Sequence, residues 1–260
     1  MTSLRVTLIG GPTALIELEG FRLLTDPTFD APGEYTLPYV TLRKLAAPAL
    51  TAEKLGPIDA VLLSHDQHAD NLDQAGRAFL ARTARVLTTE AGAKRLGNGA
   101  RGLEPWATVE LSKPDRRALS ITATPARHGP AGIEPLSGDV IGFVVGPSDQ
   151  RTRPLYITGD TVWYDGVAEV ARRYRPAVVL PFAGSARTRG PFHLTMDTND
   201  VIETAHAFPD ALIVPLHCEG WAHFTQSGED LALSFKALGL GSRLRLLEPG
   251  LASNIEFAQA

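Results

Sequence analysis

Short apolar segments separated by turn residues open the chain. Residues 5–9, 14–18 and 21–25 are β-branched or alternate between apolar and polar side chains, and glycine-containing turns at 10–13 and 19–20 separate them. Runs of this length and composition between glycine and proline are typical of strands joined by hairpins. The pattern therefore predicts an antiparallel meander at the beginning of the chain.

The rest of the chain contains one irregular segment and a series of regular ones. Residues 29–57 include proline and glycine and lack a clear period, which predicts a long surface loop of the kind that lines substrate pockets. Further on, short apolar runs alternate with segments whose apolar residues recur at helical spacing. Strands are expected at 60–64, 85–88, 109–111, 118–124, 140–145, 155–158, 177–180, 211–216 and 244–247, and helices at 72–81, 90–96, 167–174, 196–208 and 228–238.

These elements fall into two halves, each of which has strands followed by helices. We therefore expect an α/β fold, a four-layer αββα sandwich in which mixed sheets pack together and helices cover their outer faces. No linker-like segment divides the sequence, so residues 1–260 are predicted to form a single domain.

Composition and charge narrow the functional classes. The chain is 44% hydrophobic and 21% charged with a net charge of −4, and its basic residues are scattered, which argues against a nucleic-acid partner. The single cysteine, Cys218, excludes an internal disulfide and a thiolate zinc cluster. The first residues do not resemble a signal peptide, and no uninterrupted apolar run approaches the roughly 20 residues that a membrane helix needs. We expect a cytoplasmic protein with a small-molecule substrate and no membrane partner, and assembly into a homo-oligomer is left open.

Metal-ligating residue types follow several of the predicted strands. Three of them come directly after the strand at 60–64, and the others follow the strands at 118–124, 155–158 and 211–216. Because strand ends position side chains rigidly at one edge of a sheet, we expect these residues to meet at a cation. Imidazoles and carboxylates suit zinc, in one or two ions, with iron or manganese as alternatives. The candidate metal ligands are His65, His68, Asp70, His128, Asp160 and His217.

The order of these segments resembles the metallo-β-lactamase superfamily, and within it the metal-dependent hydrolases of the ascorbate-lactonase type. The likeness implies a single metallo-β-lactamase-like domain, a one- or two-metal site along the edge of the sandwich, and hydrolysis by metal-activated water. It rests on Gly10-Gly11-Pro12-Thr13-Ala14 with Thr25-Asp26-Pro27, on the segment from His65 to Asp73, on Ala126-Arg127-His128-Gly129, on Thr158-Gly159-Asp160-Thr161, and on His217.

The first motif departs from the pattern HxHxDH of this family. Counting from His65 places Gln67 at the second histidine, where it would offer only a weak neutral oxygen. Counting back from the segment 70–73, which resembles DHLD, makes His68 the second histidine after a one-residue insertion. We prefer this alignment because it keeps Asp70, but it leaves Asn71 in place of the third histidine. A mononuclear or unequal site is therefore an alternative to a binuclear one.

Under this alignment the resemblance assigns a role to each candidate. It places the first cation on His65, His68 and His128 and the second on His217 and Asp70, with Asp160 as a bridge. Asp70 is also the candidate catalytic residue, because a carboxylate beside a metal-bound water can orient it and take its proton. The alternative for 65–70 is a solvated turn that caps the next helix through Asp70 or Asn71. For five further residues, one alternative is that they support the metal ligands or contact the substrate. They are Asp26, Gln67, Asn71, His193 and His223.

Three functions are compatible with these residues. The leading hypothesis is a metal-dependent hydrolase that uses metal-activated water on a small cytoplasmic metabolite, at an ester, lactone, amide or phosphodiester bond. The second is an iron-dependent oxidoreductase on the same fold. The third is a ligand-binding scaffold that has lost competent metal binding through Gln67 and Asn71. Substrate specificity is expected to reside in the loops 29–57 and 185–194.

Overall fold

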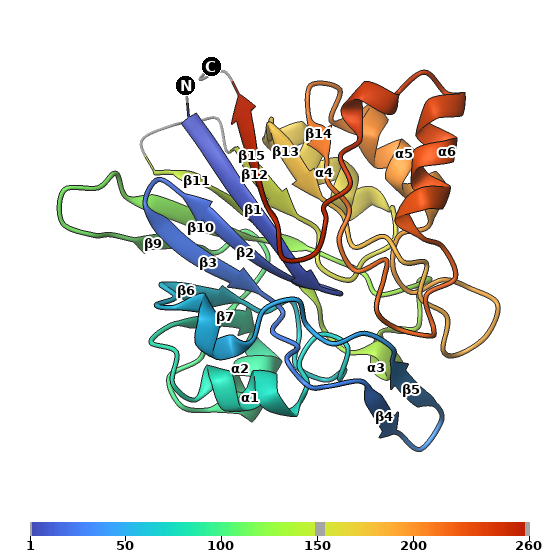
Figure 1. Cartoon of the computed structure of the whole chain (residues 1–260), viewed down its shortest axis with the longest axis horizontal. Coiled ribbons are helices and arrows are strands. Elements are labelled where there is room, and N and C mark those ends of the chain that lie inside the picture. The colour runs from blue at the N-terminus through green and yellow to red at the C-terminus, as the bar shows by residue number, and fades with distance from the viewer. Residues whose placement is uncertain (1, 149–153, 258–260) are drawn as a thin grey trace.

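The computed structural model describes residues 2–148 and 154–257. Two β-sheets pack face to face, and each carries helices on its outer side (Figure 1). This arrangement confirms the predicted α/β fold with four αββα layers. None of the helices in the described ranges is both long enough and apolar enough to cross a membrane.

The first sheet combines an antiparallel half with a parallel half. Its order is β15-β1-β2-β3-β6-β7-β8, and the strands from β3 onward pair in parallel. The hairpins predicted for the beginning of the chain are β1, β2 and β3, which pair antiparallel in sequence order. The strands are β1 (Thr2–Gly10), β2 (Thr13–Leu18), β3 (Phe21–Thr25), β6 (Ala60–Leu62), β7 (Val86–Thr89), β8 (Arg101–Leu103) and β15 (Ala252–Phe257).

The second sheet is also mixed. Its order is β14-β13-β12-β11-β10-β9, antiparallel from β9 to β12 and parallel from β12 to β14. Parallel strands place their carboxyl ends at one edge of a sheet, and the candidate ligands follow these ends. The strands are β9 (Thr108–Leu111), β10 (Leu119–Pro125), β11 (Ile141–Pro147), β12 (Leu155–Ile157), β13 (Val178–Leu180) and β14 (Leu212–Ile213).

Helices cover both outer faces. On the first sheet, α1 (Gln74–Leu80) contributes Phe79 to an apolar cluster with Val61 of β6, and α2 (Glu90–Leu96) lies against β7 and β8. On the second sheet, helices α4 (Asp165–Arg173), α5 (Thr198–Ala207) and α6 (Gly228–Ala237) pack against Val144 and Val179. The remaining short elements are α3 (Glu134–Ser137), η1 (Ala52–Leu55) and η2 (Gly241–Arg243).

Burial on both faces explains why the central strands are nearly continuous in hydrophobicity. In β11, Phe143 and Val145 point into the core between the sheets, whereas Val144 points outward to the helices. All three side chains are fully buried. Each buried side chain of this size contributes about 1.5–3 kcal/mol. A strand with two buried faces lacks the polar alternation of a half-exposed strand, as expected for a sheet covered by helices.

The segment predicted as a long loop contains a hairpin. Strands β4 (Gly33–Thr36) and β5 (Thr41–Lys44) pair antiparallel and lie beside α3 at the bottom of Figure 1. The ammonium of Lys44 lies 3.0 Å from Oδ2 of Asp73, and both side chains are buried. Asp73 also accepts hydrogen bonds from the backbone N–H groups of Phe29 and Asp30. This ion pair anchors the hairpin to the first turn of α1.

Two predicted strands differ from the structure. Of the strand predicted at 211–216, only the two residues of β14 are a strand. The strand predicted at 244–247 is wrong, because Leu244 forms only an isolated bridge with Ile213. Leu244 packs instead against the cluster under the outer helices, which satisfies its apolar side chain without a strand. The last strand, β15, pairs with β1 and was not predicted, because its side chains are mostly exposed and lack an apolar face.

Candidate metal centre

Three imidazoles and a carboxylate meet at the edge of the sandwich. Nδ1 of His68 lies 2.8 Å from Nε2 of His65 and 3.2 Å from Nε2 of His128. Oδ2 of Asp160 lies 3.5 Å from Nε2 of His128 and 4.0 Å from Nε2 of His65. The ligand atoms of all four residues lie within 4.8 Å of one another. Tetrahedral zinc with bonds of about 2.1 Å separates its ligands by about 3.4 Å, so this set matches a cation site in its dimensions.

The hydrogen bonds around the imidazoles determine which nitrogens face the centre with lone pairs. Nδ1 of His128 lies 2.8 Å from the carbonyl oxygen of Leu194, which can only accept, so Nδ1 carries the proton. The hydroxyl of Ser64 donates to Oδ1 of Asp26 at 2.6 Å and therefore accepts from Nδ1 of His65 at 2.9 Å. In the neutral rings, both Nε2 atoms then present lone pairs toward the same point. Nδ1 of His68 faces both lone pairs, and either a proton on that nitrogen or a bound cation satisfies them.

Burial keeps two of these imidazoles neutral. Desolvation lowers the pKa of His65 well below its ordinary value and lowers the pKa of His68 to about 4, and the neighbouring imidazoles act in the same direction. A neutral imidazole is the form that binds a metal ion. The residues present therefore fit a divalent cation at this position.

Asp26 supports the metal-binding residues through Ser64. A supporting role was one of the two alternatives for Asp26, the other being a local Asp-Pro turn. Its Oδ1 accepts hydrogen bonds from the backbone N–H of Ser64 at 3.0 Å and from the Ser64 hydroxyl, which in turn holds His65. The backbone of Asp26 has φ of 25°, in the left-handed region that is unfavourable for a residue with a side chain. Such an outlier next to a site is typical of a residue fixed for its position.

The pH dependence of stability should report on Asp26. Burial raises the pKa of Asp26 to about 8, opposed by the Ser64 hydrogen bonds and helped by the charge of Asp160. Between about pH 4 and 8 the folded protein therefore holds a proton on Asp26 that the unfolded chain has released, so the contribution of Asp26 to stability falls as pH rises. We expect this decline, of a few kcal/mol at most, to be absent from Asp26→Asn. Denaturant unfolding of both metal-free proteins across this range tests it, and parallel curves would contradict it.

A second cluster adjoins the first through Asp160. Nδ1 of His217 lies 3.0 Å from Oδ1 of Asp160, and its Nε2 lies 3.6 Å from Oδ2 of Asp70. The same oxygen of Asp70 lies 2.9 Å from Nε2 of His223. His217 has φ of 55°, and its N–H donates to the carbonyl of Gly11 in the turn between β1 and β2. The two clusters therefore form one continuous network.

Charge dominates this second cluster. Burial alone would raise the pKa of Asp70, but the nearby imidazoles of His217 and His223 hold it well below its ordinary value. Burial alone would lower the pKa of His217, but the nearby carboxylates of Asp160 and Asp70 outweigh it and raise the pKa to about 10. Both carboxylates are thus ionised at neutral pH, and Nε2 of His217 is buried without a hydrogen-bond partner among the described residues. This surplus of negative charge suits a cation.

The two residues that depart from the family motif do different things. Asn71 is fully buried and donates from Nδ2 to Oδ1 of Asp160 at 3.2 Å, so it supports the carboxylate. The side chain of Gln67 turns back to accept from the N–H of Asp66 at 3.2 Å, and its amide lies against Gly138. Gln67 is therefore engaged away from the cluster. The alignment that takes His68 as the second histidine agrees with this geometry.

The structure also places His193 and the start of the helix after the first motif. His193 pairs with Asp200 at 3.0 Å and with Asp197 at 3.6 Å beside α5, which is the structural role that was one of its two alternatives. The helix that follows the first motif begins after Asp73, whose side chain accepts from the N–H of Gly76, so neither Asp70 nor Asn71 is its cap. Sequence reasoning did not identify Ser64 or the Leu194 carbonyl. The position of Ser64 directly before His65 was the only available signal.

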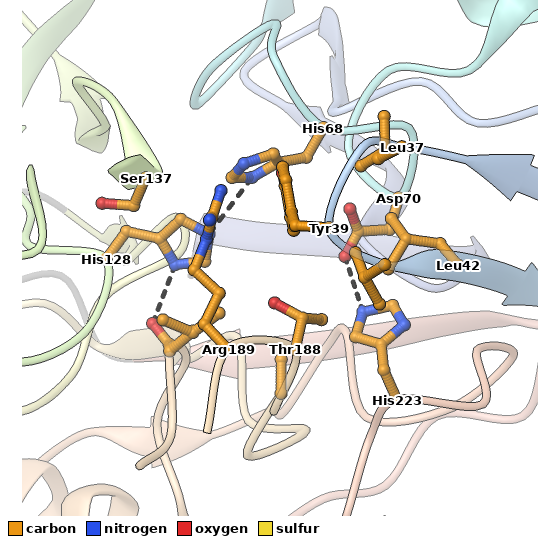
Figure 2. A pocket seen from close by; sticks show the side chains of 13 residues that line it. Leu37, Tyr39, Leu42, His68, Asp70, His128, Ser137, Thr188, Arg189 and His223 are labelled. Carbon is orange, nitrogen blue, oxygen red and sulfur yellow. Dashed lines mark hydrogen bonds and ion pairs between the residues drawn. The ribbon is translucent and has the colours of Figure 1, made fainter. Parts of the chain in front are cut away.

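A small pocket lies directly above both clusters. In Figure 2, Arg189 reaches up between His68 and His128, and Asp70 and His223 lie on the other side. The guanidinium carbon of Arg189 lies 3.6 Å from the ring centre of Tyr39 in the β4–β5 hairpin. The pocket is partly open and narrow, with a cavity volume of about 20 Å³. The pocket is lined by Leu37, Tyr39, Val40, Leu42, His68, Asp70, His128, Ser137, Ala186, Thr188, Arg189, Leu194 and His223.

Comparison with known proteins establishes the family. The sequence matches the model of the beta-lactamase superfamily domain over residues 21–218. The chain belongs to this superfamily. The matched range includes the six candidate ligands identified from the sequence, and the match confirms the resemblance to the metallo-β-lactamase superfamily. His223 lies just beyond it.

Relatives within the superfamily share most of the chain. The UPF0173 protein YddR of Bacillus subtilis is 28% identical, covering 95% of this chain and 98% of its own length. A UPF0173 metal-dependent hydrolase of Caldivirga maquilingensis is 23% identical, covering 92% of this chain and 93% of its own. The crystal structure of an isothiocyanate hydrolase from Delia radicum gut bacteria is 26% identical with a TM-score of 0.80, covering 97% and 99%. The chain is thus a metal-dependent hydrolase of the beta-lactamase superfamily.

Proposed function

We propose that this hydrolase holds one or two zinc ions at the two clusters and attacks a small, mainly apolar substrate with metal-bound water. One observation carries the proposal: the lone pairs of His65 and His128 converge with His68 and Asp160 beneath the pocket. Asp70 and His217 would hold the second ion. The single cysteine, which leaves no internal disulfide, supports action in a reducing compartment such as the cytoplasm.

The side chains around the pocket have different roles in the proposed hydrolysis. A zinc ion at the centre would supply Lewis acidity and lower the pKa of bound water toward about 7. Asp70 presents Oδ2 to His223 and keeps Oδ1 free of hydrogen bonds from the described residues, so this oxygen is available to orient the attacking water. Because its pKa is depressed, Asp70 stays ionised and accepts a hydrogen bond at any physiological pH. Asp26 and Asn71 hold the ligands in place.

The pocket favours an isothiocyanate as the first substrate to test. An isothiocyanate has its electrophilic carbon in a linear, uncharged group that needs little space. Leu37, Val40 and Leu42 provide an apolar wall for its substituent, and the related structure is that of an isothiocyanate hydrolase. Arg189 and the hairpin residue Tyr39 line this narrow pocket, so their side chains would border the substituent of a bound substrate. Esters, lactones, amides and phosphodiesters form the second group of candidates.

We expect the purified protein to consume benzyl isothiocyanate in a metal-dependent way. Dialysis against a chelator should abolish the activity, and stoichiometric zinc should restore it, because the attacking water depends on the ion held by His65, His68 and His128. The absorbance of the isothiocyanate measures consumption, and heat-denatured protein controls for spontaneous reaction with amines. Unchanged turnover in the chelator would overturn the proposal. Turnover of a lactone or ester without turnover of the isothiocyanate would contradict the proposed substrate class. Metal-dependent hydrolysis would then still be supported.

Elemental analysis distinguishes the alternative functions. Zinc in the active protein supports the hydrolase, whereas iron together with oxygen consumption would favour the oxidoreductase on the same fold. A protein that binds no metal, and is as stable in chelator as without it, would indicate the ligand-binding scaffold. These measurements need no knowledge of the substrate.

A further inference from the structure

A wider and more open groove adjoins the pocket above the metal centre. The two spaces share three lining residues, which are Tyr39 of the β4–β5 hairpin and Thr188 and Arg189 of the loop 185–194. The volume of the groove is about 710 Å³, compared with about 20 Å³ for the pocket. A volume of several hundred cubic ångströms is typical of a site for a small organic molecule. A substrate whose reacting group enters the pocket can therefore extend its other end into the groove.

The wall of the groove is mainly apolar. Leu136 of α3 is 61% exposed and Tyr39 is 47% exposed, so two large side chains of the lining leave apolar surface in contact with water. Apolar surface gathered in a hollow is typical of a ligand site. Among the described residues that line the groove, Arg189 alone is charged, which disfavours a cationic ligand. Five other lining side chains are apolar: Pro130, Ala131, Ile133, Leu136 and Phe192.

Arg189 lies at the boundary between the two spaces. The stacking of its guanidinium on Tyr39 links it to the hairpin, and its Nη2 donates to the carbonyl oxygen of Leu136 at 3.0 Å. Figure 2 shows the same side chain above the metal centre, beside His68 and His128. One residue thus connects the hairpin, the loop 185–194 and α3. A substituent that passes from the pocket to the groove would lie against this guanidinium and against Tyr39.

The groove is held in a fixed position relative to the metal centre. Ile133, Ala186 and Leu194 form a buried apolar cluster, and Phe192 packs against it. The carbonyl oxygen of Leu194 in turn accepts the hydrogen bond from His128. The segments that form the wall of the groove therefore also hold a metal ligand. Such rigid support is what a subsite needs in order to place a reacting group accurately.

We propose that the groove binds the substituent of the substrate, and that this substituent is an uncharged aromatic or branched aliphatic group that extends past Arg189 and Tyr39. The inference rests on the proposed function, because it places the electrophilic carbon of the same molecule at the metal centre. Contacts with a part of the substrate that does not react stabilise the bound substrate and the transition state equally, so they lower KM. A substrate with only a methyl substituent would gain none of these contacts.

Two isothiocyanates that differ only in their substituent test the proposal. With the zinc-loaded protein, we expect the KM of phenethyl isothiocyanate to be at least about tenfold lower than that of methyl isothiocyanate. Leu136→Asn places a polar side chain of similar size in the groove and should reduce this KM ratio by at least about threefold. Leu233→Asn is the matched control, because Leu233 on α6 is 69% exposed and is not part of the groove lining. This control should keep the KM ratio unchanged.

Equal KM values for the two substrates in the parent protein would overturn the proposal. An unchanged ratio in Leu136→Asn would also overturn it, because a residue that acts only through the fold shifts both KM values together. If neither isothiocyanate is consumed, the proposed function fails, and calorimetric binding of N-phenethylthioacetamide and N-methylthioacetamide decides the groove. Tighter binding of the phenethyl compound that is lost in Leu136→Asn would support an apolar subsite, whereas equal binding of the two compounds would contradict it.

Discussion

Asp160→Ala is expected to lower the rate of hydrolysis by more than about 100-fold and to reduce bound zinc. Loss of a residue that only supports a ligand typically costs 10–100-fold, and Asp160 faces the metal positions directly. Its Oδ2 lies near His128, and its Oδ1 contacts both His217 and Asn71. Its removal thus withdraws negative charge from both clusters and leaves His217 and Asn71 without their shared hydrogen-bond partner.

The measurement combines kcat/KM with the zinc content of each protein. His206→Ala is the matched control, because His206 is an exposed imidazole on α5 that contributes nothing to the centre. We expect this control to keep the full rate and the full zinc content. A folded Asp160→Ala protein with wild-type rate would show that the chemistry takes place elsewhere. Circular dichroism establishes that the variant is folded.

Lys44→Met is expected to lower the free energy of unfolding by about 3 kcal/mol, because removal of one partner of a buried ion pair strands the other. Lys44 is 5% exposed and Asp73 is fully buried, so little water can replace the ammonium. The backbone N–H groups of Phe29, Asp30 and Gly76 still bind Asp73, which keeps the loss at the lower end of the typical range. For a chain of this size the melting temperature should fall by roughly 5–10 °C.

Denaturant unfolding of the zinc-loaded proteins measures this loss. The exposed Lys54 supplies the control, and Lys54→Met should change stability by less than about 0.5 kcal/mol. Adding Asp73→Asn to Lys44→Met should recover part of the loss, because the unpaired charge is removed. An unchanged stability of Lys44→Met would mean that the hairpin is not anchored by this pair.

The regular elements of the core followed directly from the sequence. The helix at 90–96 has the predicted bounds, and the strands around 21–25, 118–124 and 140–145 agree to within two residues at each end. The side chains of these strands are buried at nearly all positions, so the hydrophobic pattern carries the information for them. The segments 101–103 and 252–257 lack that pattern, because they pair at the edges of the sheet and are partly exposed. Pairing at an edge depends on the neighbouring strand and not on the segment itself.

The hairpin at 33–44 likewise could not be predicted from its own residues, because its pairing depends on contacts elsewhere in the chain. Its residues are mostly exposed and its turn has no strong glycine signal, so the sequence indicated only an irregular segment. What orders it is the contact between Lys44 and Asp73, 29 residues apart in the chain. The stacking of Tyr39 on Arg189 is still more distant in sequence. These contacts bring the predicted loops 29–57 and 185–194 together over one pocket.

Hydrophobic periodicity and the positions of histidine and aspartate after strands are local properties, so the layered fold and the ligand types could be predicted from the residues alone. Which of these residues meet depends on how the elements pack. The tertiary structure placed His193 with Asp200, turned Gln67 away from the centre, and brought His223 to Asp70 across 153 residues. Distances between loops depend on the packing of the two sheets, which no local pattern specifies.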